Sequence, residues 1–138
     1  RRPAFPREHP GVTMHYVELV ALLAVVQYLF FGAMVGRARG RYGVKAPAVS
    51  GHEGFERVYR VQMNTLGLMV ALLPALFVAA RFWPSAWVAG IGAVYLVGRF
   101  IYWRAYVSAP SSRALGFALS MLPVMVLVLM GLAGALLR

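Results

Sequence analysis

Two runs of polar residues carry the side chains that could do chemistry. The first run, FERVYRVQMNTLG, places Arg57, Arg60 and Asn64 at i, i+3 and i+7, so on a helix these three share one stripe. At about 100° per residue Gln62 is turned roughly 200° from Arg60, so it faces another helix, either of this chain or of another subunit. An ionisable residue inside an apolar span costs about 2.5–3.5 kcal/mol on insertion scales and therefore indicates a functional site.

The second run, YLVGRFIYWRAY, places phenol and guanidinium groups on another stripe. Its members at i, i+4, i+7 and i+11 are Tyr95, Arg99, Tyr102 and Tyr106, and Arg113 follows just beyond. If the two runs belong to antiparallel spans and lie at the same membrane face, both stripes line one pocket. Arginine binds carboxylates bidentately and tyrosine donates a hydrogen bond, so this pocket suits a small polyanion.

The amino-acid composition indicates whether these residues lie in a soluble or a membrane protein. The chain has 138 residues, of which 61% are hydrophobic and 13% charged, with a mean hydropathy of +0.70. Soluble domains average about 45–50% apolar and about 25% charged residues. We therefore expect an integral membrane protein, and not a soluble globule, an acidic disordered tail or a repeat array.

Four apolar stretches are each long enough to cross the hydrocarbon core as a helix, which takes roughly 20 residues. They cover about residues 16–35, 58–80, 83–106 and 115–137. The links are a polar segment over residues 36–55, a tight hairpin over 81–86 and a third turn over 107–113. Short links join antiparallel helices, so we expect an all-α fold in which residues 1–138 form a single transmembrane domain, an up-down four-helix bundle. Pro74 and Pro123 are expected to kink their spans.

The residue types that are missing or scattered exclude several functions. Without cysteine the chain has no disulfide, thiolate-ligated zinc, iron–sulfur cluster or protein thiol nucleophile, so a thiol in the chemistry belongs to the substrate. The three histidines lie scattered in the tail and first loop, and we expect no metal site. The net charge of +10 sits mostly at the ends of apolar runs, which is typical of anchoring at a lipid–water boundary and not of nucleic-acid binding.

The basic residues also favour one orientation. On the side of the first and third loops lie Arg37, Arg39, Arg41, Lys45, Arg57, Arg104 and Arg113. On the other side lie Arg1, Arg2, Arg7, Arg81 and Arg138. By the positive-inside rule, the first and third loops are expected to be cytoplasmic.

The motif FERVYRVQMN, with Tyr102-x-x-x-Tyr106 and Arg113 seven residues later, resembles the MAPEG family, the membrane-associated proteins in eicosanoid and glutathione metabolism. The segment RARGRYGVKAPAVSGH is similar to its bacterial branch, and the likeness covers about residues 14–137. The resemblance implies a homotrimer in the bacterial inner membrane, with glutathione at each subunit interface near the cytosolic side. A lipophilic small molecule would reach the same place through the membrane lipid.

The resemblance also implies roles for residues of this chain. Glutathione would be contacted from one subunit by Arg60, Asn64, Tyr102 and Tyr106, and from the neighbouring subunit by Gln62 and Arg39. Arg113 would be the catalytic residue, which activates the thiol of glutathione. In the loop, Arg37 or Arg41 could take the place of Arg39.

Gly67 departs from the family pattern. Family enzymes of this type usually carry glutamate there, which holds the ammonium group of glutathione, and the lost charge-assisted bond is worth roughly 1.5–3 kcal/mol. Three consequences stay open: Glu18 or Glu56 supplies the carboxylate, glutathione binds weakly, or the natural ligand is another molecule.

These observations lead to two main hypotheses for function. The first is a membrane-embedded glutathione transferase, with peroxidase activity as a further expectation, that conjugates or reduces lipophilic electrophiles. The alternative is a non-catalytic lipid-binding or lipid-presenting membrane protein of the same fold, which Gly67 favours and the retained arginine and tyrosine residues disfavour. A small transporter or channel component has weaker support, because a four-span chain needs oligomerisation to build a pathway and shows no acidic relay.

Overall fold

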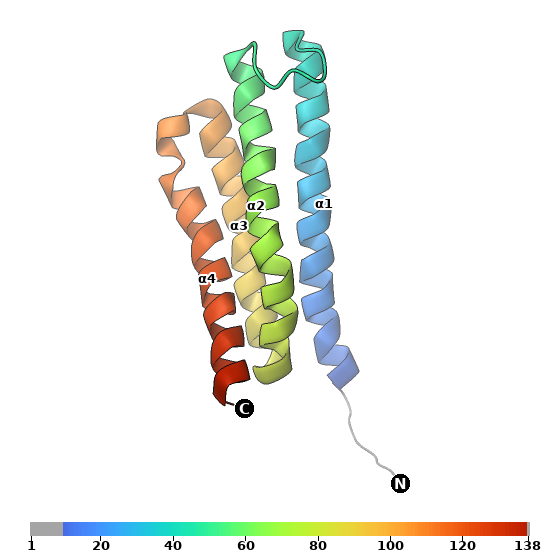
Figure 1. Ribbon diagram of the computed structural model, residues 1–138, viewed down its shortest axis with the longest axis vertical. Coiled ribbons are helices and arrows are strands. Elements are labelled where there is room, and N and C mark those ends of the chain that lie inside the picture. Colours follow the sequence, from blue (N-terminus) through green and yellow to red (C-terminus); the bar gives the residue numbers. More distant parts are fainter. Residues whose placement is uncertain (1–9, 138) are drawn as a thin grey trace.

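The computed structural model describes residues 10–137, which form four long helices. The elements are α1 (Pro10–Tyr42), α2 (Glu53–Phe82), α3 (Ser85–Ser108), the 3₁₀ turn η1 (Pro110–Ser112) and α4 (Ala114–Leu137). The helices lie side by side and alternate in direction (Figure 1). Each is long and apolar enough to cross a membrane. The predicted all-α, up-down four-helix membrane bundle is therefore confirmed for this part of the chain, while Arg1, Arg2, Arg7 and Arg138 lie outside it.

The first link is shorter than its sequence indicates. Residues 36–55 were expected to be a polar loop, but α1 continues to Tyr42 and α2 begins at Glu53. Packing explains the extra helix, because Val35 and Ala38 of α1 are buried against Phe55 of α2. Gly36 and Gly40 disfavour a helix here, so burial against α2 and not local propensity continues α1 beyond the apolar run.

The other connections follow the prediction. α2 ends at Phe82 and α3 begins at Ser85, with Pro84 as the residue that precedes the helix. The indole Nε1 of Trp83 donates a hydrogen bond to the carbonyl oxygen of Met130 at 2.8 Å, which ties this hairpin to α4. Pro74 and Pro123 lie inside α2 and α4, respectively.

The links from α1 to α2 and from α3 to α4 lie at the same end of the bundle (Figure 1), which we call the loop end. The hairpin between α2 and α3 lies at the opposite end. The beginning of α2 and the end of α3 therefore meet at the loop end, as antiparallel threading predicts.

Glycine allows α3 and α4 to approach each other closely. A Cβ atom on Gly98 would lie 2.6 Å from the backbone carbonyl carbon of Leu119, and one on Gly116 would clash with the backbone nitrogen of Tyr102. Lipid offers no hydrophobic driving force between helices, so their association relies on such close packing and on interhelical hydrogen bonds.

We expect Gly98→Ala and Gly116→Ala each to destabilise the bundle by about 1–3 kcal/mol, because the added methyl group meets backbone that cannot move aside. Thermal unfolding of the detergent-solubilised protein measures the effect. Gly67→Ala and Gly90→Ala are matched controls, since a Cβ at either position meets no atom within 4 Å. Equal melting temperatures for all four variants would contradict this account of the contact.

Candidate functional site

Arg99 of α3 is fully buried and joins three helices. Its Nε donates a hydrogen bond to Ser120 Oγ of α4 at 2.9 Å. Its Nη1 donates to Asn64 Oδ1 at 2.8 Å and to Thr65 Oγ1 at 3.0 Å, both on α2. The guanidinium carbon also lies 4.4 Å from the centroid of the Tyr102 ring. One cation therefore holds α2, α3 and α4 together.

All hydrogen-bond partners of this guanidinium are neutral. Its third nitrogen, Nη2, is buried and makes no hydrogen bond within residues 10–137. Neutral oxygens lower the cost of burying the charge but do not cancel it. The surroundings of Arg99 therefore keep a positive potential, which favours an anion nearby.

Tyr102 is the point at which the predicted site residues meet. Its buried ring packs edge-on against Tyr106 with the centroids 5.4 Å apart, and the guanidinium of Arg113 lies 5.9 Å from the centroid of Tyr106. Arg60 and Arg113 are both close enough to interact electrostatically with the Tyr102 hydroxyl. Arg60 and Arg113 are exposed, and Asn64 is half-buried. The two predicted stripes therefore converge at the loop end. The arginines lie exposed at its surface, and the other groups lie progressively more buried.

Gln62 points in a different direction from this group. Its Nε2 lies 2.9 Å from the position that a Cβ atom of Gly32 would take, so it contacts α1 of its own chain. The sequence left open whether Gln62 faces its own chain or another subunit, and within the subunit described here the answer is α1. A contact with a neighbour's glutathione stays a prediction.

Arg39 holds the first link in place. Its Nη1 donates to the carbonyl oxygens of Ala48 at 2.7 Å and Val44 at 3.4 Å, and its guanidinium carbon lies 4.7 Å from the centroid of Phe55. This side chain therefore fastens residues 43–52 onto the start of α2. Its role toward glutathione stays a prediction.

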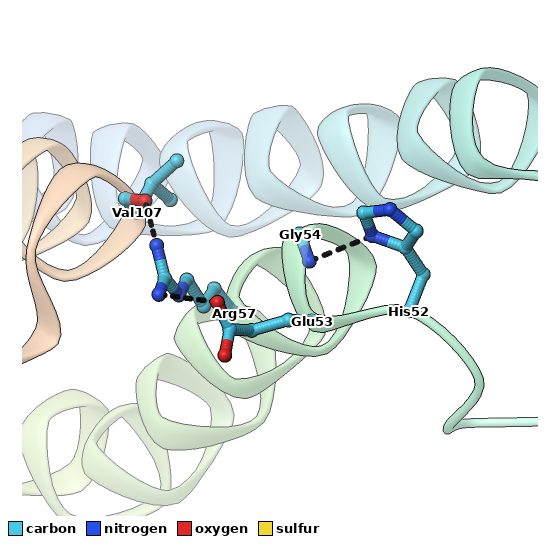
Figure 2. A network of polar contacts seen from close by, with 5 residues as sticks. All are labelled: His52, Glu53, Gly54, Arg57 and Val107. Atoms are coloured by element: carbon cyan, nitrogen blue, oxygen red, sulfur yellow. Dashed lines mark hydrogen bonds and ion pairs between the residues drawn. The ribbon is translucent and has the colours of Figure 1, made fainter.

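Arg57 fastens the start of α2 to the end of α3 (Figure 2). Its Nη1 donates to the carbonyl oxygen of Val107 at 3.2 Å, and its Nη2 pairs with Glu53 at 2.7 Å. His52 Nδ1 accepts a hydrogen bond from the backbone N–H of Gly54 at 2.9 Å and so caps α2. These contacts hold the start of α2 and the end of α3 together at the loop end.

The two acids considered as substitutes at position 67 lie far apart. Glu56 is at the loop end, where its Oε2 accepts a hydrogen bond from the Gly51 N–H at 3.0 Å. Glu18 lies in an apolar groove of about 420 Å³ beside Phe77. Phe77 and residue 60 are about 25 Å apart along α2, so Glu18 does not reach the site. Within the described ranges no three His, Asp or Glu side chains gather as metal ligands.

Two members of the Arg99 network were not predicted. Thr65 follows Asn64 directly and looks like an ordinary span residue, and Ser120 lies on a helix to which the sequence assigned no site residue. A signal for Ser120 exists, because it is the only hydroxyl-bearing residue of α4. A lone polar side chain in a strongly apolar span indicates a polar partner on a neighbouring helix.

The fold and site define a four-span membrane bundle with arginine and tyrosine side chains gathered at one membrane boundary. The sequence matches the MAPEG family over residues 17–133. It is 46% identical over 110 residues to an uncharacterized protein of Synechocystis sp., covering 80% of each chain. It is 35% identical over 115 residues to microsomal glutathione S-transferase 2 of Homo sapiens, covering 83% of this chain and 78% of that one. It is 34% identical over 94 residues to leukotriene C4 synthase of Bos taurus, covering 68% of this chain and 63% of that one. The chain belongs to the MAPEG family and is an integral membrane protein, as its motifs predicted.

We expect Arg39→Ala to loosen the first link, because the carbonyl oxygens of Ala48 and Val44 lose their donor. Lys45 is exposed and is the single lysine of the chain, so an endoproteinase specific for lysine cuts at one place. Cleavage should become several-fold faster in Arg39→Ala, since local opening controls access to the bond. Arg37→Ala removes an exposed arginine from the same helix and should leave the rate unchanged. Equal rates for both variants and the unmodified protein would refute the fastening role.

Proposed function

We propose that this protein is a membrane-embedded glutathione transferase that joins glutathione to lipophilic electrophiles and also reduces lipid hydroperoxides. One observation carries the proposal: guanidinium, phenol and carboxamide groups converge at the loop end. They belong to Arg60, Asn64, Tyr102, Tyr106 and Arg113. The name of a human relative, microsomal glutathione S-transferase 2, supports the same proposed activity.

The chemistry of these groups fits the tripeptide. Glutathione carries two carboxylates and one ammonium group, so it is a net anion. Exposed Arg60 can bind a carboxylate through two parallel hydrogen bonds. Tyr102 and Tyr106 offer hydroxyl donors on apolar rings, and the uncompensated charge of Arg99 lies against the ring of Tyr102.

Arg113 is the residue we assign to activation of the thiol. A free thiol has a pKa of about 8.5, so only a few per cent is thiolate at neutral pH, and the thiolate is the nucleophile. A guanidinium beside the sulfur favours the charged form, and the proton leaves to water. The sulfur then forms a bond to the electrophilic carbon while the leaving group departs with its electron pair. With a hydroperoxide, the thiolate sulfur takes the terminal oxygen, the O–O bond breaks, and the alkoxide takes a proton from water and leaves as the alcohol. The thiol of a second glutathione then displaces water from the sulfenic acid and forms the disulfide.

The proposed assembly places this reaction between two solvents. In a homotrimer, Gln62 and Arg39 of one subunit would reach the glutathione bound by the next. The electrophile would arrive through lipid along a groove between subunits, while glutathione enters from water at the loop end. With the first and third loops facing the cytoplasm across a bacterial inner membrane, the basic loop end would meet the cytosolic glutathione pool.

Arg113→Ala tests the proposed activation. We expect kcat for conjugation of glutathione to an aryl halide to fall about 10²-fold, because a positive group aimed at the developing charge is lost. The rise of rate with pH should also move upward, toward the pKa of about 8.5 of a free thiol. Product absorbance measures both. Arg104→Ala is the control, since this arginine is exposed on α3 beside Trp103 and lies outside the site. Equal rates in the Arg113 variant and the unmodified protein would remove Arg113 from the mechanism.

Gly67→Glu tests the family carboxylate that this chain lacks. Gly67 is exposed, and no atom lies within 4 Å of the position of a Cβ atom there, so a glutamate fits. We expect glutathione to bind about tenfold more tightly or better, because a charge-assisted bond to the ammonium group is worth roughly 1.5–3 kcal/mol. Titration calorimetry in detergent measures the Kd. Gly67→Gln has the same size without the charge, and an equal gain in that variant would show that the carboxylate is not the cause.

The absence of a carboxylate at Gly67 also favours the alternative function, a non-catalytic lipid-binding or lipid-presenting protein. The same titration distinguishes the two functions. No binding of glutathione at millimolar concentration to the unmodified protein, together with binding of a fatty acid, would support the alternative and reject the transferase.

A further inference from the structure

The orientation of the Asn64 carboxamide follows from its partner. A guanidinium only donates hydrogen bonds, so the oxygen of the carboxamide faces Arg99, as the 2.8 Å contact shows. The NH₂ group at the other end of the carboxamide then points away from Arg99. Since Arg99 is fully buried and Asn64 is half-buried, this direction leads away from the buried core.

The hydroxyl groups beside Arg99 are arranged to hold it. Thr65 Oγ1 donates its hydrogen to the Val61 carbonyl oxygen at 2.7 Å, and Ser120 Oγ donates its hydrogen to the Gly116 carbonyl oxygen at 2.7 Å. Both oxygens therefore present lone pairs to the guanidinium and act there as acceptors. The guanidinium is fixed at two of its nitrogens from two different helices, which sets its plane as well as its position.

Loss of Arg99 would not leave these hydroxyl hydrogens without partners, because each is bonded within its own helix. The oxygens of Thr65, Ser120 and Asn64 would each lose the hydrogen bond they accept from Arg99. The two hydroxyl groups would keep the bonds they donate, so the carboxamide of Asn64 is the group whose orientation depends on Arg99. The network therefore fixes the orientation of one carboxamide, that of Asn64. This carboxamide belongs to the proposed binding site.

We propose that Arg99 is a positioning residue that locks the Asn64 carboxamide so that its NH₂ group is presented to a carboxylate of the bound tripeptide. The identity of that ligand rests on the proposed function. A locked carboxamide offers donors alone on the ligand side, and an anionic acceptor then binds without the cost of ordering the side chain. Arg99 touches no ligand in this role and acts through Asn64.

Asn64 is the single asparagine of the chain, which makes a direct test possible. Protein labelled with ¹⁵N at the asparagine side chain gives one pair of NH₂ signals, and these report the state of Asn64 in the free protein. We expect Ser120→Ala and Arg99→Lys to shift the signals, because the first removes the acceptor of Nε and the second cannot bridge both neighbouring helices. Ser108→Ala is the matched control, since its exposed hydroxyl bonds only to carbonyl oxygens of α3.

A ligand titration completes the experiment. Ser120→Ala should lower the melting temperature relative to Ser108→Ala, because Arg99 Nε loses its buried acceptor. At a temperature where both variants are folded, Ser120→Ala should also raise the Kd for glutathione about three- to tenfold, as expected for loss of one supporting hydrogen bond. Thr65→Val should act in the same direction, and Thr65→Ser, which keeps the acceptor, should restore the signals and the affinity.

The outcomes separate this inference from the proposed function. Unshifted NH₂ signals in Ser120→Ala and Arg99→Lys would overturn the positioning role, whatever the ligand. Shifted signals with unchanged glutathione affinity would overturn its functional part. If the unmodified protein binds no glutathione, the proposed function and the ligand assignment both fail, and the spectrum of the free protein still decides the orientation of Asn64.

Discussion

A guanidinium buried among apolar helices needs acceptors for its donors, and this requirement fixes how α2, α3 and α4 meet. Inside a membrane no bulk water supplies those acceptors. Arg99 finds them on α2 and α4, and it reaches Ser120 because glycine at positions 98 and 116 lets the backbones of α3 and α4 approach. The close packing and the polar network therefore depend on each other, and a change in either disturbs the same set of contacts.

The network also places positive charge at two depths of the loop end. From the loop end inward, the polar groups pass from exposed Arg60 and Arg113 through half-buried Asn64 to buried Arg99. Positive charge is therefore present both at the water boundary and beneath it, where screening by salt is weaker. In the proposed transferase, an anionic headpiece would bind at this boundary while an apolar reactant stays in lipid.

The sequence predicted the features that depend on composition and periodicity. Four apolar runs gave four helices, and the spacing of Arg60 and Asn64 on one helix and of Tyr102 and Tyr106 on another placed them on faces that meet. Periodicity identifies a face but not its partner, which is why Ser120 and Thr65 were missed. The rotation of α4 that brings Ser120 to Arg99 is set by backbone contact at glycine, and no hydrophobic pattern records it.

The extension of α1 and the position of Arg39 escaped prediction for a related reason. Both depend on tertiary contacts at the loop end, where Val35 and Ala38 pack on Phe55 and a guanidinium binds loop carbonyl oxygens. Local composition marks this segment as polar and rich in glycine and proline, which is typical of a loop. Burial against α2 outweighs that local preference at the first seven residues, and only residues 43–52 remain as a link.

Gly67 changes the charge balance of the proposed site in two opposing ways. A carboxylate there would attract the ammonium group of glutathione, so its absence weakens binding of the ground state. The same carboxylate would also oppose the thiolate, so its absence leaves the field of the arginines at the sulfur undiminished. The first effect acts on bound substrate and transition state alike and enters KM, whereas the second grows as negative charge is stabilised on sulfur and enters kcat. A glycine at this position is therefore compatible with catalysis at high glutathione concentration, and weak affinity alone does not argue for a protein that only binds lipid.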